Sequence, residues 1–561
     1  MQELIENIFN EILEKNGIQK LRISKSNRPD LCDFQCNEVF KLAKTLNMAP
    51  MDIGNKIVKV VNDYSDFYKY FKEVTFVMPG FINIKVSDYI INECIRKMNV
   101  DHYGIAKPEH INTYILDYGG YNIAKPLHIG HLRPSIIGEA IKRIVMYKGH
   151  KVIADVHLGD FGLQMGQVIY GILKDNKDIE DIDIDYLNKI YPEISGLCKE
   201  NEEVKKECEK ITKELQNGNE EYTNIWNKIY QVSLDDVKEL CNYLDIHFDL
   251  WQGEYDANKY LDDVEALLND KNLLVKSEGA LVVPVKQDED NKPMPPMMFK
   301  KSNGGYVYDS TDLATIYERK TKYNPDYILY VTDFRQNLHF EQVFRVSELL
   351  GLVPYNRLIH AYNGTINGTD GKPFKTRKGD APKLRELFDM VKETFVSLKE
   401  SNKDMSDVDL DKITNAIIKF ADLSNSRDKD YIFDIEKFSG VVGKTGPYIL
   451  YTYLRINKVI KDNMYKELGD TIYNDTDRNL RMKILELQSS FEASLKEYKP
   501  HYIAEYIYNL CVEANNFYEN NHINGCDDQA KLNDWVYILD LTNRIIKDML
   551  SLLMIEIPSK M

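Results

Sequence analysis

The segment from Tyr114 to Arg143 constrains the fold of this chain more than any other. It begins with the apolar run YIL, passes through a turn rich in glycine, and continues as an amphipathic run from about Pro134. An apolar run, a glycine turn and a helical period predict a strand, a loop and a helix. A unit of this kind is typical of folds in which strands and helices alternate.

The same order of elements returns later in the chain. Residues 151–172 contain a second apolar strand that leads through a glycine turn into a helix, and residues 304–340 contain further strand-like and helix-like runs. Strands that alternate with helices predict a parallel sheet. Because ligands bind at the carboxyl ends of such strands, we expect His157, Asp160 and Gln164, which follow the second strand, to lie near a binding site.

Two histidines lie in the loop of the first unit. Only two residues separate His128 from His131, and one of them, Gly130, leaves room above the backbone for a flat ring. The free N–H groups and positive dipole of a helix start suit a phosphate. Histidine pairs also bind metals, but a zinc protease would carry His-Glu-x-x-His on a helix. Here the spacer is Ile-Gly and Pro126 lies upstream, so we favour phosphate and predict no metal site.

Composition excludes several classes of protein. Of the 561 residues, 43% are apolar and 29% are charged, as in globular proteins. No apolar run approaches the roughly 18 residues of a membrane span, and the acidic, amphipathic N-terminus does not resemble a signal peptide. We therefore expect a cytoplasmic protein with no membrane partner. The eight cysteines are scattered, and Cys32 and Cys36, four positions apart on an expected helix, should pack rather than bind zinc.

The net charge of −16 counts against a general nucleic-acid binder, because phosphate contacts require lysine and arginine. The charge is uneven, however. Residues 174–222 alone contain 8 Lys/Arg and 15 Asp/Glu. A basic face elsewhere on the molecule therefore remains possible.

The string from Asn122 to Arg133, NIAKPLHIGHLR, resembles the HIGH signature of the class I aminoacyl-tRNA synthetases, and in this longer form that of the arginyl-tRNA synthetases. The likeness extends over essentially the whole chain. It implies ATP-dependent activation of L-arginine to arginyl-adenylate, followed by transfer to the 3′-terminal adenosine of tRNA(Arg), with release of pyrophosphate and AMP. Expected ligands are L-arginine, ATP, Mg²⁺ and tRNA(Arg), and the usual state of the family is a monomer.

The resemblance also implies a multidomain α/β protein with three parts. We expect an N-terminal α+β domain that binds the tRNA elbow at 1–108, a Rossmann-type parallel-sheet catalytic domain at 109–404, and a C-terminal all-α helical-bundle domain that binds the anticodon at 405–561. The catalytic domain would contain a connective insertion at about 173–300 and a KMSKS-like loop at about 363–384. On the sequence alone, the insertion is a solvated, charged, largely helical segment.

Acidic and polar residues at predicted strand ends suit an arginine pocket, because a guanidinium presents five donors in a planar fork. Each alone could be a helix cap or a surface group. By resemblance, Asp117, Tyr308 and Asp312 bind the guanidinium, and Asn122 and Gln336 hold the α-amino end.

The KMSKS-like loop departs from the general class I pattern. Residues 374–377 read FKTR where MSKS is expected, so the second lysine is missing. By resemblance, Lys125, just before the HIGH motif, compensates for it; a solvated loop lysine is the alternative. The expected catalytic residues are His128, His131 and Lys125, and the expected ATP contacts are His128, Gly130, His131, Lys375, Arg377 and Lys378.

Contacts to tRNA are expected on both flanking domains. A strand pair around Pro79-Gly80 places Phe81 and Asn83 where the family stacks on and hydrogen-bonds to the tRNA elbow, although Phe81 could equally be a core residue. In the last domain, Tyr448, Tyr451 and Arg455 share one helix face. For the two tyrosines, a core role and RNA contact are both open.

Two other functions stay open. One is another class I synthetase, but a cysteinyl enzyme needs zinc ligands that are absent here and a glutamate pocket should be basic. The other is an inactive RNA-binding paralogue, which should have lost the histidines or the pocket acids that this chain keeps. The resemblance further implies that bound tRNA is required before arginine is activated.

Overall fold

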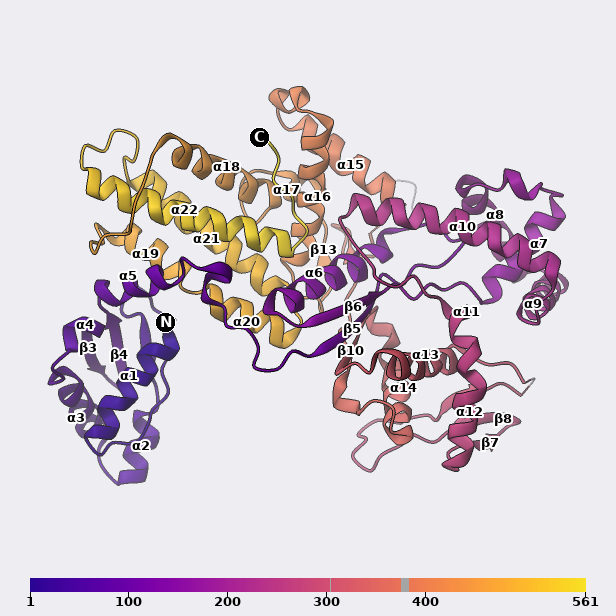
Figure 1. Cartoon of the computed structure of the whole chain (residues 1–561), viewed down its shortest axis with the longest axis horizontal. Helices are drawn as coiled ribbons and strands as arrows, with labels where there is room; N and C mark the ends of the chain where they lie inside the picture. The colour runs from indigo at the N-terminus through magenta and orange to yellow at the C-terminus, as the bar shows by residue number, and fades with distance from the viewer. Residues whose placement is uncertain (303, 375–382) are drawn as a thin grey trace. The chain divides into compact units, whose positions relative to one another are not determined.

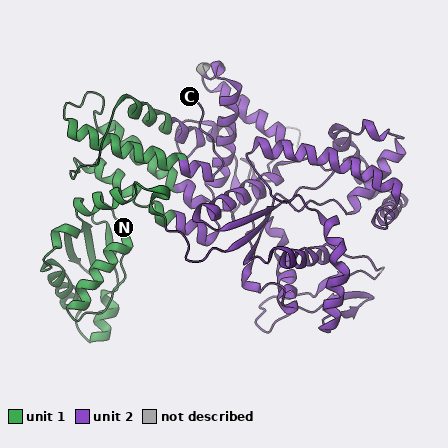
Figure 2. Ribbon diagram, in the orientation of Figure 1, with its two compact units in different colours: residues 1–105, 452–490, 506–547 green, residues 106–451, 491–505, 548–561 purple. Residues whose placement is uncertain are grey.

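The computed structural model describes residues 1–302, 304–374 and 383–561. The chain forms two compact units (Figure 2). Unit 1 comprises residues 1–105, 452–490 and 506–547, and unit 2 comprises residues 106–451, 491–505 and 548–561. Each unit therefore contains segments that are distant in the sequence.

A four-stranded parallel sheet lies at the centre of unit 2. Its order is β11 (Leu358–His360), β10 (Tyr327–Val331), β5 (Thr113–Tyr118) and β6 (Lys151–Asp155). The strand predicted at the start of the HIGH segment is thus a central strand, and its residues are almost all buried. The Rossmann-type parallel sheet is confirmed.

Helices cover both faces of this sheet (Figure 1). Successive side chains of a strand point to opposite faces. On one face, Ile115 packs into a core shared with α13 (Tyr308–Tyr323) and α14 (Asn337–Leu350). On the other face, Tyr118 lies against Gly138 of α6 (Leu132–Lys148), where a β-carbon would come within 2.2 Å of the tyrosine. Glycine therefore permits the close approach of helix and strand.

Helix α6 begins two residues before the predicted start and is buried on most sides rather than amphipathic. Its buried polar residues have partners. Tyr118 donates to Glu139 at 2.7 Å, and Arg133 contacts Asp422 at 3.0 Å. Gly149, with φ of 109°, ends the helix in the left-handed region. The helix that follows the HIGH motif is therefore fixed by packing and by buried charge pairs.

The segment between α7 (Leu163–Lys174) and α13 is largely helical, as predicted. Its elements are η3 (Ile179–Asp181), α8 (Ile184–Glu200), α9 (Glu202–Gln216), α10 (Glu220–Tyr243), α11 (Glu254–Ala257), η4 (Asn258–Tyr260), α12 (Leu261–Asp270), β7 (Val275–Ser277), β8 (Ala280–Val283) and β9 (Met297–Lys300). The remaining described elements of unit 2 up to residue 445 are η2 (Ile129–His131), η5 (Phe334–Gln336), η6 (Tyr355–Arg357), β12 (Ile366–Asn367), α15 (Leu384–Ser397), η7 (Glu400–Asp404), α16 (Asp407–Leu423), β13 (Tyr431–Ile432) and α17 (Ile435–Ser439).

Unit 1 contains an antiparallel sheet of order β1-β2-β4-β3, covered by helices. Its elements are α1 (Gln2–Lys15), β1 (Ser24–Lys25), β2 (Phe34–Cys36), α2 (Val39–Leu46), α3 (Pro50–Asn62), α4 (Phe67–Tyr70), β3 (Phe71–Val77), β4 (Phe81–Val86), α5 (Asp88–Lys97) and η1 (Asp101–Gly104). The predicted strand pair around Pro79-Gly80 is β3 and β4. The helix expected at Cys32 and Cys36 is wrong: Cys36 lies in β2, and the helix begins at Val39, where the apolar period of 3.6 residues starts.

The C-terminal part of the chain is helical, as predicted. Its helices are α18 (Gly446–Asp462), α19 (Asp475–Ile484), α20 (Leu487–Glu497), α21 (His501–Asn520) and α22 (Gln529–Leu552). Among the residues that the structure describes, no helix combines the length and apolarity needed to cross a membrane.

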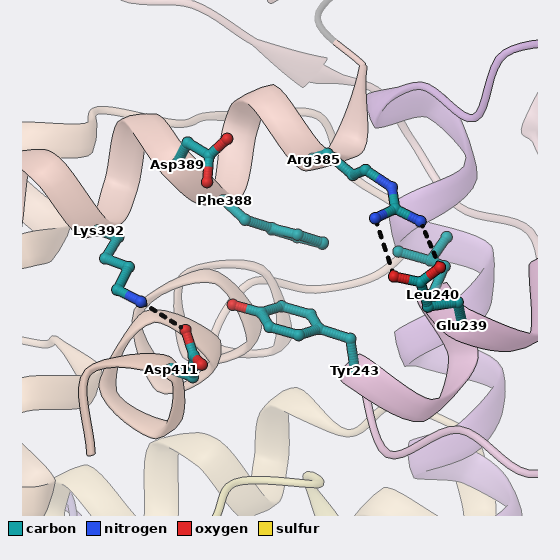
Figure 3. Close-up of a pocket in the computed structure, with 8 residues that line it drawn as sticks. All are labelled: Glu239, Leu240, Tyr243, Arg385, Phe388, Asp389, Lys392 and Asp411. Atoms are coloured by element: carbon teal, nitrogen blue, oxygen red, sulfur yellow. Dashed lines mark hydrogen bonds and ion pairs between the residues drawn. The ribbon is translucent and has the colours of Figure 1, made fainter. Parts of the chain in front are cut away.

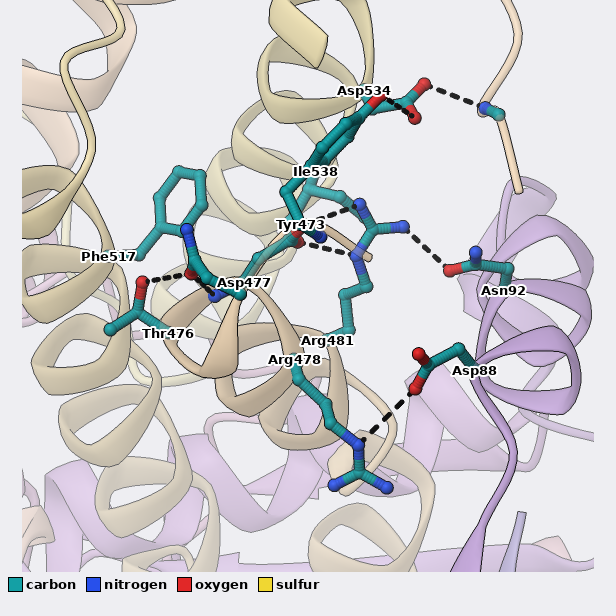
Figure 4. A network of polar contacts seen from close by, with 12 residues as sticks. Asp88, Asn92, Tyr473, Thr476, Asp477, Arg478, Arg481, Phe517, Asp534 and Ile538 are labelled. Atoms are coloured by element: carbon teal, nitrogen blue, oxygen red, sulfur yellow. Dashed lines mark hydrogen bonds and ion pairs between the residues drawn. The ribbon is translucent and has the colours of Figure 1, made fainter. Parts of the chain in front are cut away.

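A buried ionic network fixes α19 within unit 1 (Figure 4). Arg481 is fully buried and donates to Asp477 at 2.6 Å and to Asn92 of α5 at 2.7 Å. Arg478 donates through both terminal nitrogens to Asp33, at 2.9 and 2.7 Å. Helix α19 is thereby tied to α5 and to the residue before β2 by groups that are largely buried.

We expect Arg481→Met to lower the free energy of unfolding of unit 1 by about 3–5 kcal/mol, because it leaves the buried Asp477 carboxylate without its counter-ion. Chemical denaturation followed by circular dichroism measures this loss. The exposed pair Lys15–Glu11, also spaced four residues on a helix, supplies the control. Lys15→Met should leave the transition unchanged, and an equal effect of the two substitutions would contradict the role given to Arg481.

Candidate active site

The loops after β5 and β6 form the base of the candidate site and are locked together. Asn122 and Gly159 pair as an isolated parallel bridge. A β-carbon at Gly159 would lie 2.6 Å from the side-chain oxygen of Asn122, so glycine is required for this approach. Gln164 donates to the Gly159 carbonyl at 2.6 Å. The buried Asp160 accepts from the Tyr255 N–H, and burial raises its pKa to about 7.

The HIGH residues form a single 3-10 turn, η2, ahead of α6. The Gly130 N–H donates to His128 Nδ1 at 3.1 Å, and the His128 N–H donates to His131 Nδ1 at 3.2 Å. The two rings lie 4.1 Å apart. Because each Nδ1 accepts a hydrogen bond, these contacts assign the proton of each neutral ring to Nε2.

Both histidines are uncharged at neutral pH. Burial lowers the pKa of His131 to about 3, and burial together with the nearby Lys125 lowers the pKa of His128. Each ring therefore offers one Nε2–H donor. Two neutral donors at a helix start can bind phosphate oxygens without a change of protonation. Lys125 is half-buried, with its ammonium 5.4 Å from the centre of the Tyr191 ring on α8.

Asp117 and Asp155 hold a buried guanidinium that belongs to the protein itself. The two aspartates are register partners on β5 and β6. Arg319 of α13, which is 0% exposed, donates through Nη2 to Oδ2 of each aspartate at 2.6 Å. Among the described residues, its Nε and Nη1 have no hydrogen-bond partner. Asp117, predicted to bind substrate arginine, thus already contacts one guanidinium.

His157 extends this cluster. Its ring nitrogens are buried and have no hydrogen-bond partner among the described residues, and its Nε2 lies 3.8 Å from Asp312 Oδ1. Burial lowers the pKa of His157, but Asp117, Asp155 and Asp312 together outweigh burial and raise it. Asp117, Asp155 and His157 are residue types that bind metals, and their ligand atoms lie within 4.8 Å of one another. The Arg319 guanidinium, already bound to both carboxylates, makes this cluster a poor metal site.

A second cluster lies at the start of α13. His339 of α14 contacts Asp309 through Nδ1 at 2.6 Å and Asp312 through Nε2 at 2.5 Å. Tyr308, 59% exposed, places its ring centre 4.5 Å from that of His339. Because both ring nitrogens face carboxylates, both must donate, and His339 is an imidazolium. Burial opposes this charge, but the hydrogen bonds to the two aspartates raise the pKa of His339 to about 9.

The structure therefore brings several predicted pocket residues to the same end of the sheet. Asn122 is half-buried on the loop after β5, and Gln336 is exposed in η5 after β10, the neighbouring strand. Asp312 lies beside the cluster that contains Asp117, because its Oδ1 is 3.8 Å from Nε2 of His157, a member of that cluster. Sequence reasoning missed Asp155, Arg319, Asp309 and His339. One signal was present: Asp309 and Asp312 are three positions apart and so share a helix face.

Three of the predicted ATP contacts, Lys375, Arg377 and Lys378, lie outside the described residues. The described residues on either side of these positions show where the loop begins and ends. Phe374 is buried, and its N–H donates to the Ile366 carbonyl at 3.0 Å. Beyond the loop, Lys383 pairs with His128 as an antiparallel bridge, and the Leu384 N–H donates to the Leu127 carbonyl at 3.0 Å. The KMSKS-like segment therefore ends beside the HIGH turn.

A cavity of about 250 Å³ between α10, α15 and α16 contains none of the predicted site residues (Figure 3). Four of its charged groups form pairs: Arg385 contacts Glu239 at 2.9 Å, and Lys392 contacts Asp411 at 3.0 Å. The Phe388 ring stacks on that of Tyr243. Because none of the predicted site residues lines this cavity, we do not take it as the active site.

The predicted tRNA contacts lie on accessible faces. Phe81 and Asn83 point to the half-exposed face of β4, whereas the alternating residues Ile82 and Ile84 are buried. Phe81 is therefore not a core residue. Asn83 accepts from Gln35 at 2.8 Å.

On α18, Tyr448 is half-buried and Tyr451 is 47% exposed. The Arg455 guanidinium lies 4.0 Å from the ring centre of Tyr518. Neither tyrosine is fully buried, so both remain accessible.

Comparison with known proteins covers the whole chain. Residues 95–435 match the family model of the class I tRNA synthetase (R) catalytic domain, residues 449–561 that of the DALR anticodon binding domain, and residues 1–86 that of the arginyl tRNA synthetase N terminal domain.

Individual relatives agree with these family models. The chain is 38% identical to the arginine–tRNA ligase of Alkaliphilus oremlandii over 100% of both chains, and 38% identical to that of Agathobacter rectalis over 96% of both. The crystal structure of arginyl-tRNA synthetase from Plasmodium falciparum superposes with a TM-score of 0.81 at 27% identity, covering 100% of this chain and 99% of that one. The chain therefore belongs to the arginyl-tRNA synthetase family, the class I arginine–tRNA ligases.

Proposed function

We propose that the arginine–tRNA ligase reaction takes place at the carboxyl ends of β5, β6 and β10. The carboxylate of L-arginine attacks the α-phosphorus of ATP and releases pyrophosphate, and the arginyl group then passes to the 2′-hydroxyl of the terminal adenosine of tRNA(Arg). No protein nucleophile is required. The observation that carries this proposal is a pair of neutral histidines on the turn before α6, at the same sheet edge as two clusters of buried carboxylates.

The histidine turn is assigned to ATP. The Nε2–H groups of His128 and His131 donate to α-phosphate oxygens and ribose, and Gly130 leaves space for adenine. Lys125, with Lys375, Arg377 and Lys378 of the KMSKS-like loop, neutralises the remaining phosphates. The bridge between His128 and Lys383 supports this arrangement, because it anchors the end of that loop beside the turn.

Mg²⁺, bound to the phosphate oxygens of ATP, neutralises the charge that builds on them. None of the described carboxylates is assigned to it.

The acidic clusters are assigned to arginine. Asp312 and the Tyr308 hydroxyl accept from the guanidinium, and Asn122 and Gln336 hold the α-amino end. Asp117 shares its carboxylate with Arg319, so substrate would contact its other oxygen. Burial raises the pKa of Asp117 although Arg319 opposes the shift. A substrate guanidinium at that oxygen would act against burial and favour the ionised form of Asp117.

The flanking regions are assigned to tRNA. Phe81 and Asn83 on β4 contact the elbow, and Tyr448, Tyr451 and Arg455 on α18 contact the anticodon arm. The division into domains at 1–108, 109–404 and 405–561 stays a prediction. We further propose that the protein acts in the cytoplasm as a monomer.

Replacing His128 by alanine should lower kcat for pyrophosphate exchange about 10²–10³-fold and leave the KM for arginine nearly unchanged, because the lost donor strengthens only in the transition state. Steady-state exchange at varied arginine concentration measures both constants. His110, exposed in the segment before β5, provides the control, and His110→Ala should leave both constants unchanged. An equal rise in the KM for arginine would contradict the role of His128.

Arginine activation should require tRNA. Exchange of pyrophosphate into ATP, tested with arginine, glutamate, glutamine and cysteine, is expected with arginine alone and only when total tRNA is present. Bound tRNA would order the pocket or the KMSKS-like loop. Exchange with arginine in the absence of tRNA would overturn this requirement, and tRNA binding without any exchange would favour an inactive paralogue.

A further inference from the structure

The contacts of His339 suggest a role that goes beyond holding two helices together. The side chain is 7% exposed and links Asp309 and Asp312, which lie on the same face of the first turns of α13. The ring of Tyr308 covers one side of the imidazole, and the ring of Phe340 packs at its edge. His339 thus holds Asp312 at the site while remaining largely hidden from solvent.

We propose that His339 is a positioning residue that sets the charge of the arginine pocket, because its protonated bridge between Asp309 and Asp312 leaves the three groups with one net negative charge. One negative charge matches one guanidinium. This inference rests on the proposed function, in which Asp312 accepts from the guanidinium. In this inference His339 keeps Asp312 oriented and ionised. Neither the family resemblance nor the spacing of residues in the sequence gave His339 this role.

The groups that face His339 support a permanent charge near neutral pH. On α13 these are Tyr308, Asp309 and Asp312, and on β11 it is His360, whose pKa burial lowers to about 4. His360 is therefore neutral and adds no competing charge. Asp312 also faces His157, whose Nε2 lies 3.8 Å from Asp312 Oδ1. Since the folded pKa of His339 is about 9, above the ordinary 6.5, the protonated bridge is present at neutral pH. Its contribution to stability is complete below about pH 6.5 and is lost as the pH rises through 9.

Loss of the imidazolium changes what Asp312 can do. In His339→Gln the two carboxylates face each other without a cation between them. Neighbouring carboxylates share a proton, because each raises the pKa of the other. Asp312 is then partly neutral and binds a guanidinium less well, and the affinity becomes dependent on pH in the range where this shared proton dissociates.

The test measures tRNA-stimulated pyrophosphate exchange at pH 7 with arginine and with ATP as the varied substrate. His339→Gln should raise the KM for arginine about 10- to 100-fold, in line with the loss of a hydrogen bond to a charged group, with kcat and the KM for ATP nearly unchanged. Between pH 5.5 and 8 this KM should fall as the pH rises, whereas that of the wild type should not.

Asp309 supplies the decisive controls. Asp309→Asn keeps an acceptor for His339 but removes a charge, so the three groups together become neutral and the KM for arginine should rise. The double variant Asp309→Asn/His339→Gln restores one negative charge and should recover much of the arginine affinity lost in His339→Gln. If the bridge only tied α13 to α14, Asp309→Asn would be harmless and the double variant would be the worst of the three, which would overturn the inference.

Asp312→Asn separates this inference from the proposed function. If it leaves the KM for arginine unchanged, the proposed pocket is wrong. If it raises that KM while His339→Gln and Asp309→Asn do not, the pocket stands and only the role of His339 is overturned. Thermal unfolding of each variant confirms that the fold is retained, and an unchanged KM for ATP serves as an internal check.

Discussion

The parallel register of β5 with its neighbours β6 and β10 is the constraint on which the candidate site depends. Pairing of Asp117 with Asp155 on one side, and with Tyr330 on the other, brings three loops to the same sheet edge. Residues separated by up to about two hundred positions thereby share one site. The bridge between Asn122 and Gly159 continues the parallel pairing beyond the strands, so the turn with the two histidines starts from a fixed base.

Buried charge pairs then connect the sheet to its helices. Arg319 joins α13 to β5 and β6, and Arg133 joins α6 to Asp422 on α16. Such pairs add little net stability over apolar packing, since desolvation offsets most of the attraction, but an unpaired member is strongly unfavourable. They therefore favour one arrangement of helices over alternatives. In unit 1, Arg481 forms a buried charge pair of the same kind with Asp477.

The histidines near the site differ in protonation because their surroundings differ. His128 and His131 accept backbone hydrogen bonds and are neutral, whereas His339 donates to two carboxylates and is charged. The first two can hydrogen-bond to an anionic nucleotide, and the third stabilises the acids to which we assign the cationic amino acid. The same type of side chain thus occurs neutral and charged at one sheet edge, because burial and hydrogen-bond partners place its pKa on opposite sides of neutrality.

The sequence by itself determined the family, the parallel sheet and the histidine turn, because these depend on local patterns: an apolar strand, a glycine loop and a helix in sequence order. Only the tertiary structure decided that Asp117 is already bound to Arg319 and that His339 bridges Asp309 and Asp312. The residues of these contacts come from strands and helices far apart in the chain, and no local period specifies which of many buried charges will meet. For the same reason, the sequence placed Phe81 in a strand but left its face open, and strand pairing turned Ile82 and Ile84 inward instead.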